Sequence, residues 1–428
     1  MNDMDGHFTA GVVEQRYVLG RQDEDDTGIL RLGRYLALDS STGAHVAMDA
    51  LRPHAVLICG KRGYGKSYTM GTLVEELTLL PPGVRENITP LIIDTMGIFW
   101  TLSHENTAET NLLQQWGLEP HGFDVDVFVP ASMIDEYRNR HINAIPFAIP
   151  ISHMDGYGWC RLFNVDEVSP LGVLLVRIID ELKHAHDLFA FDDIMDAIRE
   201  DERSDTLVKS AAENYFRTAV SWGVFHRKGT PITELVGGKP AVLDVSTIEN
   251  RAVRSAVVSI IAREIYARRL EARRSYERMS MGDMDVEKGL PMVWLFIDEA
   301  HLFMPAEENT LASDVLINEW IRQGRQPGLS IILATQRPSA IHPDVISQSD
   351  MVICHRLTSR DDIEALEAIR PTYMKEDIGQ SIRKMGNERG IALIVDDTSE
   401  TAHIVRMRPR ISWHGGNEPS ALGKETDQ

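Results

Sequence analysis

Residues 55–67, which read AVLICGKRGYGKS, decide the fold. The first five, Ala55–Cys59, form an unbroken apolar run that is typical of a strand buried on both faces of a parallel sheet. The next eight match the pattern G-x-x-x-x-G-K-[ST], in which glycines let successive backbone N–H groups face an anion. The stretch that follows, SYTMGTLVEELTLL, repeats its apolar residues with helical spacing. Strand, glycine-rich turn and helix in this order predict a phosphate-binding loop.

We expect this loop to hold ATP and Mg²⁺. Lys66 would reach the β- and γ-phosphates, and the Ser67 hydroxyl would ligate Mg²⁺. The helix N-terminus adds partial positive charge at the same place. A glycine-rich turn that binds nothing is the alternative interpretation. The predicted nucleotide-binding residues are Gly60, Arg62, Gly63, Tyr64, Gly65, Lys66, Ser67 and Tyr68.

A second buried strand, Val293–Ile297, ends in the letters DEAH. Asp298 at the strand end is predicted to hold the magnesium ion, and Glu299 to orient or deprotonate the attacking water. Acidic residues commonly end strands, so the pattern alone is weak. Together with the phosphate loop it favours an ATP-hydrolysing protein over a nucleotide-binding switch or a small-molecule kinase.

Polar residues also flank the next strand, Ser330–Ala334. Gln336 follows it and is predicted to sense the γ-phosphate or the water, because the carboxyl ends of parallel strands open on one face; a polar strand cap is the alternative. Arg322 and Arg325 precede the strand, at the end of a predicted helix. Either arginine would stabilise transition-state charge in a neighbouring subunit's site, or would pair with the helix C-terminus. Spacing leaves these alternatives open.

Short apolar strands alternate with helical patterns over much of the chain, which predicts an α/β fold with a mainly parallel sheet. The order of the segments predicts four parts. These are a short β-rich N-terminal leader (1–50), an ATPase core (51–100 and 236–416), a mostly helical insertion (101–235) and a flexible tail (417–428).

Composition narrows the class of protein. No apolar run of the 428 residues approaches the roughly 18 that a membrane helix needs, and the acidic N-terminus lacks a signal pattern, so we expect a cytoplasmic protein without a membrane partner. The three cysteines are expected to be reduced, and no zinc-ligand spacing occurs. The net charge of −20 argues against an outer surface coated for DNA binding, but not against a narrow basic channel. The arginine-rich stretch 251–274 is expected to be a solvated helix face, with DNA contact as the alternative.

Four of these segments together resemble one family. GKRGYGKS, IDEAH, QGRQPGLSIILATQRPS and HPDVISQSD are similar to motifs of HerA-like ATPases of the FtsK–HerA group. The closing segment 405–416, VRMRPRISWHGG, resembles that family's C-terminal strand, which packs on a neighbouring subunit. The resemblance implies a RecA-like core, a homohexameric ring and ATP-driven movement of double-stranded DNA through a central channel. It also implies an arginine acting in trans, with Arg325 the better match and Arg322 the second.

Two features depart from the family pattern. Only about 54 residues precede the first core strand, so the family's N-terminal β-barrel is shortened or rebuilt, and the motif DTMGIFW at Asp94 lacks its usual acidic follower. Family members often work with a separate nuclease or effector. The resemblance therefore implies such a partner in DNA end processing or in defence against foreign DNA. An ATP-dependent assembly scaffold for an effector and a conjugation- or secretion-type DNA pump are the alternatives.

Overall fold

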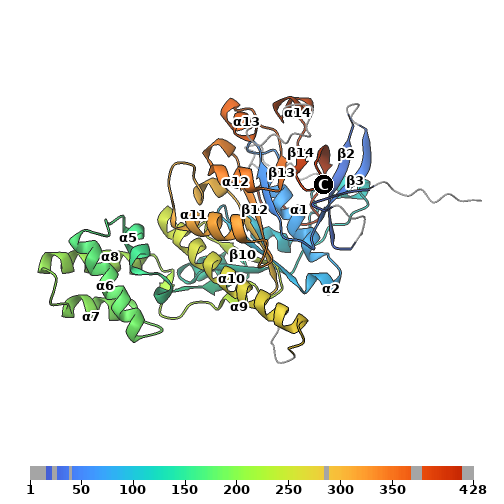
Figure 1. Cartoon of the computed structure of the whole chain (residues 1–428). Coiled ribbons are helices and arrows are strands. Elements are labelled where there is room, and N and C mark those ends of the chain that lie inside the picture. Colours follow the sequence, from blue (N-terminus) through green and yellow to red (C-terminus); the bar gives the residue numbers. More distant parts are fainter. Residues whose placement is uncertain (1–15, 22–26, 38–40, 284–288, 368–377, 417–428) are drawn as a thin grey trace, which may run out of the picture.

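The protein is described by a computed structural model that covers residues 16–21, 27–37, 41–283, 289–367 and 378–416 (Figure 1). The predicted leader, residues 1–50, lies partly outside these ranges, and the predicted tail, 417–428, lies wholly outside them. Within the described residues, no helix is both long and apolar enough to cross a membrane.

One thirteen-stranded sheet organises the described chain, in the order β1-β3-β2-β15-β14-β13-β4-β12-β11-β5-β10-β6-β7. From β13 to β7 neighbouring strands are parallel, whereas β13, β14, β15, β2 and β3 pair antiparallel and β1 lies parallel to β3. The parallel part is β4 (Ala55–Cys59), β5 (Ile88–Asp94), β6 (Asp126–Pro130), β7 (Ala144–Phe147), β10 (Ala241–Asp244), β11 (Met292–Ile297), β12 (Leu329–Thr335) and β13 (Met351–Cys354). The remaining strands are β1 (Arg16–Leu19), β2 (Ile29–Leu36), β3 (Thr42–Asp49), β14 (Ile391–Asp396) and β15 (Thr401–Met407).

Helices cover both faces of this sheet. Strand β4 shows why, because Val56 and Ile58 join one buried cluster while Leu57 and Cys59 join the other. Helix α1 (Lys66–Thr78) packs into the first cluster and α10 (Arg251–Ser280) into the second. The other core helices are α2 (Pro82–Arg85), α3 (Thr110–Gln115), α4 (Ile134–Asn139), α9 (Ile232–Leu235), α11 (Leu311–Val315), α12 (Pro343–Gln348), α13 (Arg360–Glu367) and α14 (Ile378–Lys384). This is the α/β architecture that the sequence predicted.

Four helices form a separate bundle at one end of the molecule (green in Figure 1). They are α5 (Gly156–Phe163), α6 (Pro170–Ala185), α7 (Phe191–Glu200) and α8 (Thr206–Ser221). Trp159 is fully buried among them, and its ring centroid lies 5.2 Å from that of Phe216. Aromatic side chains of this size supply much of the apolar area that a small bundle buries.

The region 101–235 contains strands that the sequence did not predict. Strands β6 and β7 extend the main sheet, and β8 (Ile149–Pro150) pairs with β9 (Phe225–His226). These runs are short and interrupted by proline, so their apolar pattern is weak. Pro146 lies on the edge strand β7, where a missing backbone N–H is tolerated. The helical part is therefore narrower, at residues 156–221, and the domain boundaries remain predictions.

The β-rich N-terminal segment also joins the main sheet. Tyr35 and Gly33 of β2 pair with Val405 and Met407 of β15. A chain segment from the beginning of the sequence is thus hydrogen-bonded to one near its end.

Candidate functional site

The phosphate loop lies between β4 and α1, as predicted. Gly63 and Gly65 have φ angles of 79° and 115°, a region that favours glycine. Gly60 lies so close to the turn after β13 that an added Cβ would be 2.6 Å from Cβ of His355. The backbone N–H of Lys61 donates to the Arg356 carbonyl at 2.8 Å. The glycines are therefore required by the shape of the loop and by its packing on β13.

The loop meets the acidic strand end at Ser67. Its hydroxyl donates to Oδ2 of Asp298 at 3.0 Å, although the two residues are 231 positions apart. Burial, followed by the charge of Glu299, raises the pKa of Asp298. A hydroxyl and a carboxylate side by side are the hard oxygen ligands that Mg²⁺ prefers, so these residues fit the predicted ion.

Lys66 is buried at the start of α1. Burial lowers its pKa, while the charges of Glu299 and Asp298 act in the opposite direction. Its Nζ donates to the Lys61 carbonyl at 3.5 Å. The ammonium group is therefore folded towards the loop in which the phosphates are expected.

Glu299 and Gln336 are brought together from the ends of β11 and β12. Nε2 of Gln336 donates to Oε1 of Glu299. Nδ1 of His301 lies 3.4 Å from Oε2 of Glu299 and 3.1 Å from Oγ1 of Thr335. Burial and then the charge of Arg337 lower the pKa of His301. Sequence reasoning did not assign His301 a role; the only signal was its position two residues after Glu299.

Asp94 is engaged in a turn. Its carboxylate accepts from the backbone N–H groups of residues 96–99 at 2.7–3.0 Å. Burial and then the charge of Asp244, its neighbour across β5 and β10, raise the pKa of Asp94 to about 7. Tyr137 donates to Asp244 at 2.5 Å. Both oxygens of the Asp94 carboxylate are therefore occupied within the turn that follows β5.

Arg322 and Arg325 lie away from this chain's own loop. Both precede the amino end of β12, whereas Gln336 follows its carboxyl end, and seven strand residues span about 20 Å. Arg322 pairs with Asp344, and Arg325 Nη2 pairs with Asp350 Oδ2 at 3.1 Å. Neither contact involves the nucleotide loop of this chain.

The segment after β15 packs on α1 of its own chain. Arg408 and Arg410 pair with the buried Glu75 at 2.9 and 3.4 Å. Tyr68, predicted to contact nucleotide, donates to Glu109 at 2.9 Å and accepts from the backbone N–H of Arg410 at 2.7 Å. Its hydroxyl is therefore occupied by the C-terminal segment and by Glu109.

The cysteines are free and buried, as expected for reduced thiols. Cys59 and Cys354 are register partners on β4 and β13. Contact with Cys59 and burial raise the pKa of the Cys354 thiol.

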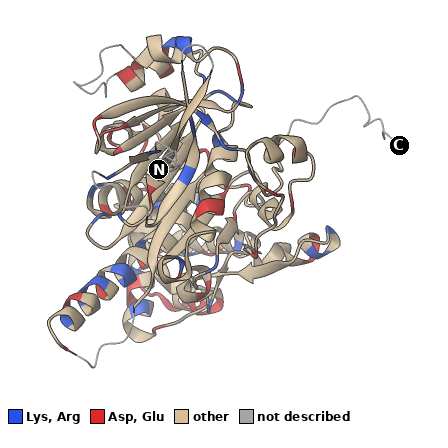
Figure 2. Cartoon of the chain, turned by 90° about the vertical axis from the view of Figure 1, so that its right-hand side faces the viewer, with Lys and Arg blue, Asp and Glu red and all other residues tan. Residues whose placement is uncertain are grey.

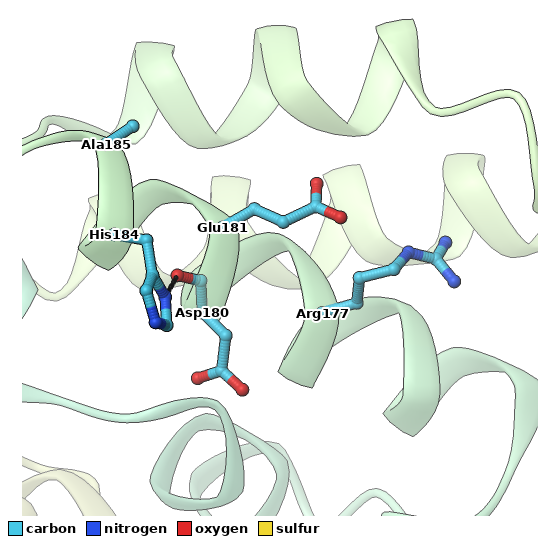
Figure 3. A pocket seen from close by; sticks show the side chains of 5 residues that line it. All are labelled: Arg177, Asp180, Glu181, His184 and Ala185. Carbon is cyan, nitrogen blue, oxygen red and sulfur yellow. Dashed lines mark hydrogen bonds between the residues drawn. The ribbon is translucent and has the colours of Figure 1, made fainter.

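A surface hollow of about 520 Å³ lies on α6, in the helical bundle (Figure 3). Arg177, Asp180, Glu181, His184 and Ala185 line it. Arg177 already pairs with Asp201 at 2.8 Å, and Nδ1 of His184 lies 2.7 Å from the Asp180 carbonyl oxygen. These contacts are local to the bundle, and the lining includes no residue of the phosphate loop.

Charges of both signs are interspersed along α10, the long helix that leads into the grey trace at 284–288 (Figure 2). Exposed ion pairs join Arg273 to Glu277 and Arg278 to Asp283. This mixture favours the interpretation of a solvated face.

Three comparisons place the chain among known proteins. Residues 30–265, more than half of the chain, match the family model "Helicase HerA, central domain", and residues 248–376 match the model "Zonular occludens toxin (Zot)". A probable DNA double-strand break repair helicase HerA of Methanocaldococcus jannaschii is 29% identical over 132 residues, or 31% of this chain and 25% of that protein. The HerA of Sulfurisphaera tokodaii is 26% identical over 196 residues, or 45% and 36%. The match thus spans about a quarter to a third of these relatives' own length.

A solved structure shows the same fold. VirB4 of Thermoanaerobacter pseudethanolicus superposes with a TM-score of 0.56 at 13% identity, covering 91% of this chain and 98% of that one. With a phosphate loop between β4 and α1 in a largely parallel sheet, the chain has the architecture of a P-loop ATPase, and it belongs to the HerA helicase family.

Proposed function

We propose that this protein hydrolyses ATP in the cytoplasm to move double-stranded DNA as a homohexameric ring, together with a separate nuclease or effector. The observation that carries the ATPase part is the meeting of the start of α1 with the ends of β11 and β12: Ser67 donates to Asp298, and Gln336 donates to Glu299. The DNA and ring parts are supported by the HerA family match and by relatives named as DNA double-strand break repair helicases.

Each residue has a separate task in this proposal. Lys66 binds the terminal phosphates, and Ser67 and Asp298 would hold Mg²⁺, which would supply positive charge beside the phosphates. Glu299 orients the attacking water and receives its proton. Gln336 senses the γ-phosphate and donates to Oε1 of Glu299. When loss of the γ-phosphate moves Gln336, the carboxylate of Glu299 therefore moves with it.

The catalytic arginine comes from a neighbouring subunit in this proposal. Arg325 is the better candidate and Arg322 the second, since both lie at the amino end of β12 and cannot serve their own loop. An arginine supplied in trans raises the rate of phosphoryl transfer by roughly 10³–10⁵.

The first test measures ATP hydrolysis by the purified protein with and without linear duplex DNA, beside Lys66→Ala. DNA-stimulated turnover that disappears in Lys66→Ala supports the motor. Turnover that is insensitive to DNA contradicts translocation and favours the assembly scaffold. Light scattering of the same samples with ATP and Mg²⁺ measures the oligomer, and a mass other than six subunits contradicts the hexamer.

A further inference from the structure

A row of five alternating charges crosses the amino-terminal end of the central strands. Arg21 Nη1 lies 3.4 Å from Asp49 Oδ1, and Asp49 Oδ2 lies 3.6 Å from Nε2 of His54. Nδ1 of His54 lies 3.0 Å from Asp350 Oδ2, and the same oxygen accepts from Nη2 of Arg325 at 3.1 Å. The row starts beside β3, passes the beginning of β4 and ends at the turn before β12.

Burial divides this row into a fixed part and an exposed end. Arg21, Asp49, His54 and Asp350 are each at most 7% exposed. The side chain of Arg325 is 69% exposed. Buried charges are tolerated when they are paired and hydrogen-bonded, as the inner four are. The four buried residues therefore hold the solvent-facing side chain of Arg325 in place.

Asp350 is itself fixed by the backbone. Its Oδ1 accepts from the N–H of Ala55 at 2.8 Å, and its own N–H donates to the Ala55 carbonyl at 3.0 Å. Arg325 uses Nη2 to reach this carboxylate, so the rest of a mostly exposed guanidinium is directed to solvent. Ordering a free arginine side chain costs conformational entropy. A pre-ordered guanidinium avoids that cost when it reaches a ligand.

Asp350 has a second cationic partner besides Arg325. The row contains three cations and two anions when His54 is protonated. Burial lowers the pKa of His54, but the hydrogen bond to Asp350 and the nearby carboxylate of Asp49 outweigh it and raise the pKa to about 9. A protonated His54 then shares the charge of Asp350 with Arg325, so that Asp350 neutralises the exposed guanidinium only in part.

We propose that Asp350 is a positioning residue, which fixes Arg325 for the active site of a neighbouring subunit, and that His54 keeps the charge of that arginine available. The inference rests on the proposed function and selects between its two arginines. Arg322 has no comparable support, because its partner Asp344 is itself 28% exposed.

The test compares kcat and KM for ATP among four variants. Arg325→Ala lowers kcat by roughly 10³-fold or more. Asp350→Asn, which keeps an acceptor for Ala55, lowers kcat by about 10²-fold, since small misplacements of a catalytic group cost about that much. KM stays within about twofold, because the variant's own loop is intact. The double variant is no slower than Arg325→Ala. The control Asp344→Asn, which breaks the analogous pair of Arg322, retains wild-type kcat.

Mixed rings separate positioning from misfolding. Lys66→Ala subunits cannot hydrolyse ATP but carry an intact Arg325. Mixed with Asp350→Asn subunits, they restore hydrolysis at the Asp350→Asn loops, whereas subunits with a damaged fold stay inactive in the mixture. His54→Gln is expected to lower kcat in the same direction and to be rescued in the same way.

The outcomes distinguish failure of the proposed function from failure of the positioning inference alone. Wild-type kcat in Arg325→Ala overturns the trans role of this arginine, and with it part of the proposed function. A large loss in Arg325→Ala together with wild-type kcat in Asp350→Asn overturns the positioning inference alone. Loss in Asp350→Asn without rescue in mixed rings also overturns it, since the defect then lies in the variant's own fold.

Discussion

Glu75 lies on α1, the helix that begins at the phosphate loop, and contacts the C-terminal segment. Its replacement tests how much these contacts stabilise the fold. The carboxylate is fully buried and accepts from Ser412 Oγ at 2.6 Å and from the Ser412 N–H at 3.0 Å. It also pairs with Arg408 at 2.9 Å and with Arg410 at 3.4 Å. In Glu75→Gln the volume is kept and the charge is lost, which leaves Arg410 buried without a carboxylate partner.

The size of the expected loss of stability follows from the burial of Glu75 and Arg410. Removing one partner of a buried ion pair costs about 3–5 kcal/mol, because the other charge remains desolvated. Because one sheet runs through most of the chain, a cooperative unit of about 350–400 residues loses roughly 1.2–1.4 °C of Tm per kcal/mol, so Tm falls by about 4–7 °C. Differential scanning calorimetry measures the shift, and limited proteolysis shows whether residues 408–416 become accessible first.

A matched control uses an exposed pair of the same chemistry. Glu136 pairs with Arg140 at the surface, with side chains 42% and 58% exposed. Glu136→Gln is expected to cost at most about 1 kcal/mol. If Tm falls no further in Glu75→Gln than in Glu136→Gln, the reasoning is refuted. Burial would then add nothing to the cost of removing the charge.

Three further predictions concern the loop and the charged row. Glu299→Gln is expected to lower kcat by about 10²–10⁴-fold, as measured by steady-state hydrolysis, and to retain the ATP affinity, as measured by calorimetry. Loss of ATP binding in this variant would contradict the role of Glu299 as the base. Gly60→Ala forces a Cβ to within 2.6 Å of Cβ of His355 and weakens ATP binding by about 1–3 kcal/mol, and unchanged affinity would show that the loop shifts freely. The raised pKa of His54, about 9 when folded against 6.5 unfolded, contributes about 3 kcal/mol of stability that is fully present below pH 6.5 and is lost as pH rises through 9. The Tm difference between the wild type and His54→Gln is therefore expected to shrink between pH 6 and pH 10, and a constant difference would contradict a charged His54.

Local patterns predicted the elements that build the site. Strand β4 begins and ends where the apolar run Ala55–Cys59 predicted, and β11 covers the predicted Val293–Ile297 with one more residue at its start. The pairing of Ser67 with Asp298 was also inferable, because the phosphate loop and the acidic strand end have a fixed mutual geometry in parallel sheets. The catalytic tasks of these residues stay predictions until kinetics test them.

The features that were not predicted depend on long-range contacts. Strand β6 has five residues and ends in Pro130, and β7 has four residues that include Pro146, so neither forms an apolar run long enough to predict a strand and its place in the sheet. His54 and Asp350 are 296 positions apart, so no local periodicity relates them. Likewise, Glu75 is buried by residues of the C-terminal segment that follow it by 335–337 positions in the sequence, and no local pattern relates residues so far apart.

The two register-paired thiols make the mobility of the phosphate loop measurable without any added probe. Cys59 immediately precedes Gly60, Cys354 immediately precedes His355, and both thiols are at most 1% exposed. An alkylating reagent reaches them only during transient openings of β4 and β13, so the rate of modification reports how often that part of the sheet opens. Cys160, buried in the distant helical bundle, serves as an internal reference in the same mass spectrum. Slower alkylation of Cys59 and Cys354 in the presence of ATP, with Cys160 unchanged, would give the free energy by which nucleotide closes its own binding loop.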